Sequence, residues 1–149
     1  MKTGAMLWCA LGLILIPMGT RRAEAAPPSQ QGGAATIARG EYLANHTSMC
    51  DDCHTDRDAH GEIIKAKHLQ GAQLTFAPKG NVPASVWADF APPLAGLTFL
   101  NDQQAVAFFT TGKMPDGKYA RGPMPQYRFS KSDAMALTAY LKSLKPAQN

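Results

Sequence analysis

The stretch that decides the fold is Cys50-Asp51-Asp52-Cys53-His54. Its two thiols are three positions apart, and this spacing lets them add as thioethers to the two vinyl groups of one porphyrin. The neighbouring imidazole then falls under the iron and becomes its proximal ligand. Cysteine and histidine are both uncommon, so a chance match in 149 residues is on the order of one in a thousand. The motif therefore predicts one covalently attached haem c, held by Cys50, Cys53 and His54.

Two other interpretations of the cysteine pair are weaker. A thioredoxin-like redox pair also contains C-x-x-C, but it needs a βαβ setting that this sequence does not indicate. A structural zinc site needs four well-spaced ligands. His60 and His68 are the remaining candidates for such a site, and they are too far apart for the usual second ligand pair.

The N-terminus is typical of a secretory signal peptide. Lys2 provides the positive start, residues 5–18 form an apolar run, and Ala23-Glu24-Ala25 is a cleavage pattern. The run is short for a transmembrane span, although an uncleaved anchor is the alternative. Cys9 lies inside this run and leaves with it. We therefore divide the chain into a signal peptide (1–25), a flexible leader (26–35) and a folded domain (36–149), and expect a periplasmic protein without a membrane span after cleavage.

Charge excludes one class of partner. The full chain has a net charge of +4, but residues beyond the predicted cleavage site carry only about +2. No basic stripe remains, so nucleic acid is not an expected partner.

Three helical stretches are predicted, which indicates an all-α domain. The first spans about 36–49 and contains Gly40, where we expect another helix to pack closely. The second spans 101–111, with an N-cap at Asn101 and a stop at Gly112. The last follows the capping pattern of Ser130 and Asp133, and its apolar residues recur at helical spacing. Residues 69–98 are rich in Gly and Pro and predict a long loop, with a short strand near 73–76. A loop of this length needs something to wrap around, and a prosthetic group would serve.

In these features the chain resembles the class I cytochrome c family, in particular bacterial monohaem domains related to dehydrogenase cytochrome subunits. The resemblance covers about 37–144, and only the interval from Gly40 to Cys50 is longer than usual, by one residue. The segments that carry it are Arg39-Gly40-Glu41-Tyr42-Leu43, CDDCH with Thr55, Ala91-Pro92-Pro93-Leu94-Ala95-Gly96, Thr110-Thr111-Gly112, Pro115-Asp116-Gly117, Gly122-Pro123-Met124-Pro125-Gln126-Tyr127 and Ala139-Tyr140-Leu141-Lys142-Ser143-Leu144.

The resemblance implies a cytochrome c-like fold, with about three main helices and long loops around one haem. It implies that Met124 is the sixth iron ligand, opposite His54. It also implies that the Pro92-Pro93-Leu94 turn lies beside His54, whose free ring N–H would donate to a backbone carbonyl, which we assign to Pro93.

The residues alone leave rivals for the sixth ligand. Met114 also precedes a proline, but it follows a helix end in a Pro-Asp-Gly turn, where we expect it to be exposed. Met124 lies between two prolines that favour a rigid segment. His46, His60 and His68 could each make a bis-histidine site.

Two aromatic residues, Trp87 and Tyr127, could pack on the haem or bond a propionate. Six basic residues are candidates to surround the haem edge: Arg57, Lys65, Lys67, Lys113, Lys118 and Arg121.

Two axial ligands would fill the iron and leave no site for a substrate. The expected function is therefore electron transfer without catalysis, between a dehydrogenase donor and an oxidase or cytochrome acceptor. One alternative is an electron-transfer subunit of a membrane-associated dehydrogenase complex. A third hypothesis is a haem enzyme or sensor with an open sixth position, and a fourth is a domain whose haem serves only folding.

Overall fold

The computed structural model describes residues 33–147, so the predicted signal peptide lies outside the described residues. Its α-helices are α1 (Ala34–Tyr42), α2 (Asp51–His54), α3 (Asp102–Thr111) and α4 (Lys131–Ser143). Two short strands, β1 (Ala72–Gln73) and β2 (Phe90–Ala91), pair antiparallel, with Ala72 opposite Ala91. Short 3₁₀ turns occupy Lys65–Lys67 and Ala95–Leu97. Within 33–147, no helix combines the length and apolar character that crossing a membrane requires.

The first predicted helix is present, but it changes type before the cysteine motif. It begins at Ala34, two residues before the predicted domain boundary, and runs as an α-helix to Tyr42. Leu43–Thr47 then form a π-helical turn, in which the Ser48 N–H donates to the Leu43 carbonyl at 2.8 Å. A π turn accommodates one extra residue within a helix. This turn lies between Gly40 and Cys50, in the interval for which the resemblance implies one residue more than usual.

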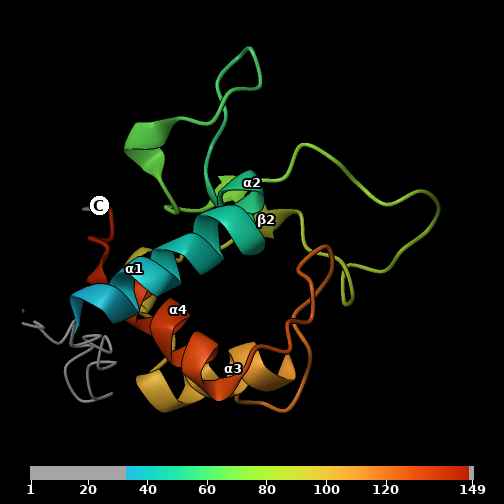
Figure 1. The fold of residues 1–149 in the computed structure, drawn as a ribbon. Coiled ribbons are helices and arrows are strands. Elements are labelled where there is room, and N and C mark those ends of the chain that lie inside the picture. Colours follow the sequence, from blue (N-terminus) through green and yellow to red (C-terminus); the bar gives the residue numbers. More distant parts are fainter. Residues whose placement is uncertain (1–32, 148–149) are drawn as a thin grey trace, which may run out of the picture.

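Gly40 is the point at which α1 crosses α4, as its position in the sequence predicts. A Cβ atom placed there would lie 2.6 Å from the Tyr140 Cβ, and it would also meet the backbone carbonyl of Ala136. Figure 1 shows α1 and α4 lying against each other, with α3 on the other side of α4. Gly40 therefore sets how closely the two helices approach.

Both later helices begin at the residues that the capping patterns predict. The Asn101 side chain accepts from the Gln104 N–H while the Gln104 side chain accepts from the Asn101 N–H, and Gly112 ends α3 in the left-handed conformation. At α4, the Ser130 hydroxyl accepts from the Asp133 N–H. The Asp133 carboxylate instead pairs with Arg39 at 2.9 Å, which joins the start of α4 to α1.

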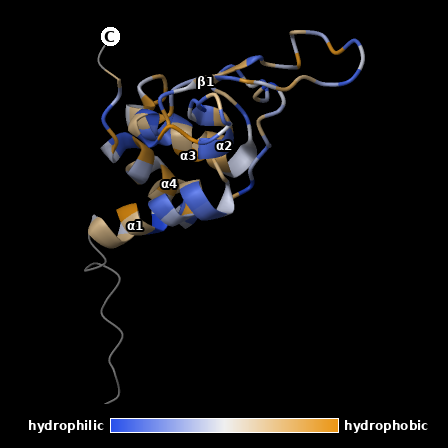
Figure 2. Ribbon diagram, turned by 90° about the horizontal axis from the view of Figure 1, so that it is seen from above, coloured by the Kyte–Doolittle hydropathy of each residue, from blue (hydrophilic) through white to orange (hydrophobic). Residues whose placement is uncertain are grey.

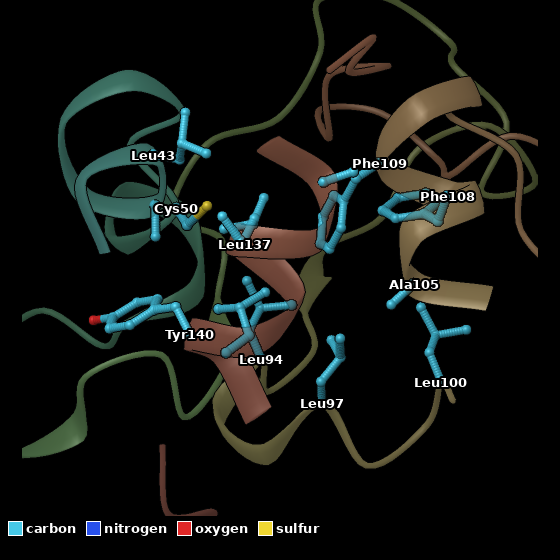
Figure 3. Close-up of a cluster of buried hydrophobic side chains, with 14 of the residues drawn as sticks. Leu43, Cys50, Leu94, Leu97, Leu100, Ala105, Phe108, Phe109, Leu137 and Tyr140 are labelled. Atoms are coloured by element: carbon cyan, nitrogen blue, oxygen red, sulfur yellow. The ribbon is translucent and has the colours of Figure 1, made fainter. Parts of the chain in front are cut away.

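The hydrophobic core lies where α1, α3 and α4 meet (Figure 3). Leu43, Leu97, Leu137 and Leu141 are almost completely buried in it. Cys50 belongs to the same cluster, so the cysteine motif is attached directly to the core. In the hydropathy colouring of Figure 2, α1 begins with hydrophobic residues and has hydrophilic residues further along.

The long loop predicted at 69–98 is present and is interrupted by the two short strands. The predicted strand at 73–76 is placed slightly too late, because the observed pairing ends at Gln73. Between the strands, residues 74–89 project from the helical body (Figure 1). The end of this segment, residues 86–88, lies beside Gly122. The Gly122 N–H donates to the Val86 carbonyl at 2.8 Å, and the Ala88 N–H donates to the Gly122 carbonyl at 2.7 Å.

Candidate functional site

A large cavity lies beside the cysteine motif. Its volume is about 1090 Å³, slightly more than the usual upper limit of about 1,000 Å³ for sites of small molecules and cofactors. Three parts of the chain line it: residues 48–54, several residues of 85–94, and most of 114–127. Cys50, Cys53 and His54 all contribute to the lining, so the structure brings the whole motif to one cavity wall.

His54 is buried, with only 5% of its surface exposed. Its place at the end of α2 is secured by the His54 N–H, which donates to the Cys50 carbonyl at 2.9 Å. Burial lowers the pKa of His54, and the hydrogen bond to a backbone carbonyl only partly offsets this effect. The imidazole is therefore neutral at pH 7, which is the form that binds a metal ion.

The carbonyl that orients His54 belongs to Pro92 and not to Pro93, so the prediction of Pro93 was wrong. The His54 Nδ1–H donates to the Pro92 oxygen at 2.7 Å, which leaves Nε2 free for a ligand bond. The reason is the position of the turn. The Leu94 and Ala95 N–H groups both donate to the Leu69 carbonyl, and the chain therefore folds toward Leu69 after Pro92.

Two residues in unusual backbone conformations support this turn. Leu69 is fully buried with a positive φ of 55°, and its N–H donates to the Thr55 hydroxyl at 2.8 Å. The Gly71 N–H donates to the His54 carbonyl at 2.8 Å. A Cβ at Gly71, where φ is also positive, would lie 2.9 Å from the Pro93 nitrogen. Only glycine lets the proline turn approach His54 this closely.

The two cysteines are free thiols that differ in burial. Burial raises the pKa of Cys50 to about 12, and burial is also the main cause that raises the pKa of Cys53. A thiol–disulfide exchange site needs the opposite shift, because the thiolate is the reactive form. The residues 33–147 also form no βαβ unit. Both observations weigh against the thioredoxin-like interpretation.

Met124 and Met114 both line the cavity and pack against the core. Met124 follows the Gly122–Pro123 peptide bond, which is cis, and its N–H donates to the Arg121 carbonyl at 3.2 Å. Met114 begins a reverse turn in which the Gly117 N–H donates to the Met114 carbonyl at 2.9 Å. The expectation that Met114 is exposed was wrong: its turn folds back against the core, so its side chain is half-buried.

The other histidines lie away from the cavity lining. His46 stacks on Tyr42 and is exposed, as is His60. His68 has both ring nitrogens occupied, since Nδ1 lies 2.8 Å from the Asp51 carboxylate and Nε2 lies 2.9 Å from the Tyr140 hydroxyl. A histidine with both nitrogens occupied is not available as an iron ligand.

The bonds of His68 belong to a network that the sequence did not indicate. Asp51 also accepts from the Thr55 hydroxyl, and Asn45 donates to the Tyr140 hydroxyl at 3.4 Å. The network connects the cysteine motif to the π turn through Asn45 and to α4 through Tyr140, and none of its residues lines the cavity. It therefore stabilises the position of α2.

The two predicted aromatic residues differ in position. Tyr127 lines the cavity, and its hydroxyl donates to the Ser48 carbonyl at 2.8 Å. Trp87 does not line the cavity, although Val86 and Ala88 do. Its ring contacts Phe76, and its Nε1–H is buried without a hydrogen-bond partner among the described residues.

Of the six predicted basic residues, only Lys118 and Arg121 line the cavity. Asp52 and Asp116 line it as well, so the charged lining residues balance. Arg57 donates instead to Asp52 and to the Gly61 carbonyl, and Lys67 pairs with Asp56. Acidic residues therefore neutralise part of the predicted basic group, while its relation to a haem edge stays a prediction.

The residues present fit a haem c. Two thiols and a neutral imidazole with one free nitrogen share a wall of an apolar cavity of cofactor size. Two methionines, Met114 and Met124, line the same cavity from a separate part of the chain. An imidazole and a thioether are both known ligands of haem iron. Among the described residues, no group of three or more Cys, His, Asp and Glu side chains forms a site for a metal ion alone.

A comparison with protein-family models finds no match. Curated relatives are found among cytochrome subunits. A protein of Gluconobacter oxydans (strain 621H), named alcohol dehydrogenase (quinone), cytochrome c subunit, is 31% identical over 144 residues, which cover 86% of this chain and 29% of that subunit. Proteins of the same name from Gluconacetobacter polyoxogenes and Komagataeibacter europaeus are each 32% identical over 122 residues, or 74% of this chain and 25% of theirs.

The chain therefore spans less than a third of the length of the curated relatives that it matches. The similarity extends over most of this chain, including the segments that build the cavity. Together with the donor set of the cavity, these similarities support a cytochrome c-like protein.

Proposed function

We propose that this chain is an exported monohaem c-type cytochrome with a cytochrome c-like fold, which transfers single electrons between redox partners. The carrying observation is the shared cavity, which Cys50, Cys53, His54 and Met124 all line. When bound, the haem supplies a one-electron iron couple. Cys50 and Cys53 would hold it covalently, and His54 and Met124 would be the ligands of its iron.

The chain's own residues restrict what this site can do. The Pro92 carbonyl holds the ring of His54 in one orientation, and Gly71 and Leu69 keep that carbonyl in place. Met124 would be the second iron ligand, from a segment that hydrogen bonds of Gly122 fix on residues 86–88. With two protein ligands the iron would have no position for a substrate, which favours electron transfer over catalysis.

A second candidate is an electron-transfer subunit of a membrane-associated dehydrogenase complex, and it fits equally well. The names of the relatives favour it, because each is the cytochrome c subunit of an alcohol dehydrogenase (quinone). In this case the electron donor is a dehydrogenase, and the acceptor is an oxidase, a quinone or another cytochrome. Co-purification of a dehydrogenase with tagged holoprotein would distinguish the subunit from a free carrier. The location in the periplasm is part of the same proposal and rests on the signal sequence.

Replacing Met124 by alanine tests the axial ligation. The oxidised variant is expected to lose the weak methionine–iron charge-transfer band, because no thioether then occupies the sixth position. The reduced variant is expected to bind carbon monoxide rapidly and completely, whereas the unmodified protein does not.

The matched control is Met114→Ala, which removes the other thioether that lines the cavity. The control is expected to keep the band. If Met114→Ala loses it and Met124→Ala does not, the ligand is Met114. Rapid carbon monoxide binding by the unmodified protein would instead favour a haem enzyme or sensor.

A further inference from the structure

One hydrogen bond connects two segments of the chain that both line the cavity. The Tyr127 hydroxyl donates to the Ser48 carbonyl at 2.8 Å, between residues 79 positions apart in the sequence. Tyr127 follows Met124 by three residues, and Ser48 precedes Cys50 by two. Both residues line the cavity. The bond therefore joins the segment of the proposed sixth ligand to the segment that holds the porphyrin.

Both ends of this bond are held by other contacts. The Tyr127 ring stacks on the Phe129 ring, with centroids 5.1 Å apart and planes at 16°. The Phe129 N–H donates to the backbone carbonyl of Phe109, in α3, at 3.1 Å. On the other side, Ser48 ends the π turn, and the Cys50 N–H donates to the Ala44 carbonyl at 2.9 Å. The bond thus ties together two anchored segments, and moving Met124 away from the cavity would strain or break it.

The surroundings keep the phenol in its donating form. Burial raises the pKa of Tyr127 to about 12. A backbone carbonyl only accepts hydrogen bonds, so this contact requires the protonated hydroxyl. The hydroxyl therefore remains a donor throughout the physiological range.

We propose that Tyr127 is a positioning residue, whose hydroxyl ties the Met124 segment to Ser48 and so holds the methionine in place as a ligand. The inference rests on the proposed His54/Met124 ligation and deepens it. Opening the sixth position requires Met124 to move, and this movement breaks the bond. Loss of the hydroxyl then raises the fraction of molecules whose sixth position is open to a small external ligand.

The test is Tyr127→Phe in the exported holoprotein, which keeps the ring and its stacking and removes only the hydroxyl. Cyanide affinity of the oxidised protein is the first readout. It is expected to rise about three- to tenfold, as for the loss of one ordinary hydrogen bond. The second readout is thermal: the methionine–iron charge-transfer band is expected to disappear at a lower temperature, while the far-UV circular dichroism transition moves little.

Tyr42→Phe is the matched control. Tyr42 is exposed on α1 and does not line the cavity, and its hydroxyl makes no hydrogen bond within residues 33–147, so this variant is expected to match the unmodified protein. Equal cyanide affinities for Tyr127→Phe and the unmodified protein, with a normal band in both, would overturn the role of Tyr127 alone. A missing band in the unmodified protein would overturn the Met124 ligation and this inference together.

Discussion

Replacing both Cys50 and Cys53 by alanine is expected to abolish covalent haem and to unfold much of the protein at ambient temperature. Both thiols line the cavity, and Cys50 is part of the core cluster. Without the thioethers, haem can bind only reversibly. The cavity of about 1090 Å³ would then expose apolar walls to water whenever the haem dissociates. A group that binds only the folded state, at a concentration about 1,000 times its Kd, contributes about 4 kcal/mol of stability, which is lost with it.

The readouts are a haem stain after denaturing electrophoresis and thermal unfolding by circular dichroism. Cys9→Ser is the control, because Cys9 lies in the predicted signal peptide, outside the described residues. The control is expected to stain like the unmodified protein. A stained band from the double variant, or an unchanged melting temperature, would contradict the role assigned to the cysteine pair.

Replacing Gly40 by alanine is expected to destabilise the protein, although alanine is the better helix former. At an exposed helical position the exchange gains about 1 kcal/mol. At Gly40 the new methyl group would meet the Ala136 carbonyl and lie 2.6 Å from the Tyr140 Cβ. Neither is the flexible end of a side chain, so α1 and α4 must move apart. Such overpacking typically costs about 1–3 kcal/mol, occasionally more. The close backbone contact favours the upper value of about 3 kcal/mol, and subtracting the gain of about 1 kcal/mol leaves a net loss of about 2 kcal/mol. The melting temperature is then lower by roughly 8 °C.

Ala38→Ser is a matched control, since it adds one heavy atom to the same helix at an exposed position. Its effect is expected to stay within about 0.5 kcal/mol. Chemical denaturation of both variants measures the difference. If Gly40→Ala were more stable than the unmodified protein, the close crossing of α1 and α4 would be wrong.

Elements with local signals were predicted best from the sequence. The capping residues Asn101, Ser130 and Gly112 form bonds within one turn of their own helix, so the sequence contains both partners side by side. The cysteine motif is likewise local, because its thiols and imidazole act from one short helix. Gly40 was predicted to face α4, since a glycine inside an apolar helix face has few other uses.

Features that depend on distant partners were not predicted. Which proline carbonyl orients His54 is decided by Leu69, whose carbonyl accepts from the residues after the turn. The burial of Met114 results from a turn that folds back onto the core. The bond from Tyr127 to Ser48 spans 79 positions. No local pattern distinguishes these partners from other residues of the same type.

The most direct test of the central claim is the intact mass of the purified, denatured and reduced protein, after export in a host that attaches haem to C-x-x-C-H proteins. The account predicts the mass of the chain from about residue 26 onward plus one haem, with peptide mapping that places both thioethers on Cys50 and Cys53. A folded, colourless protein whose mass equals that of the polypeptide alone would contradict it.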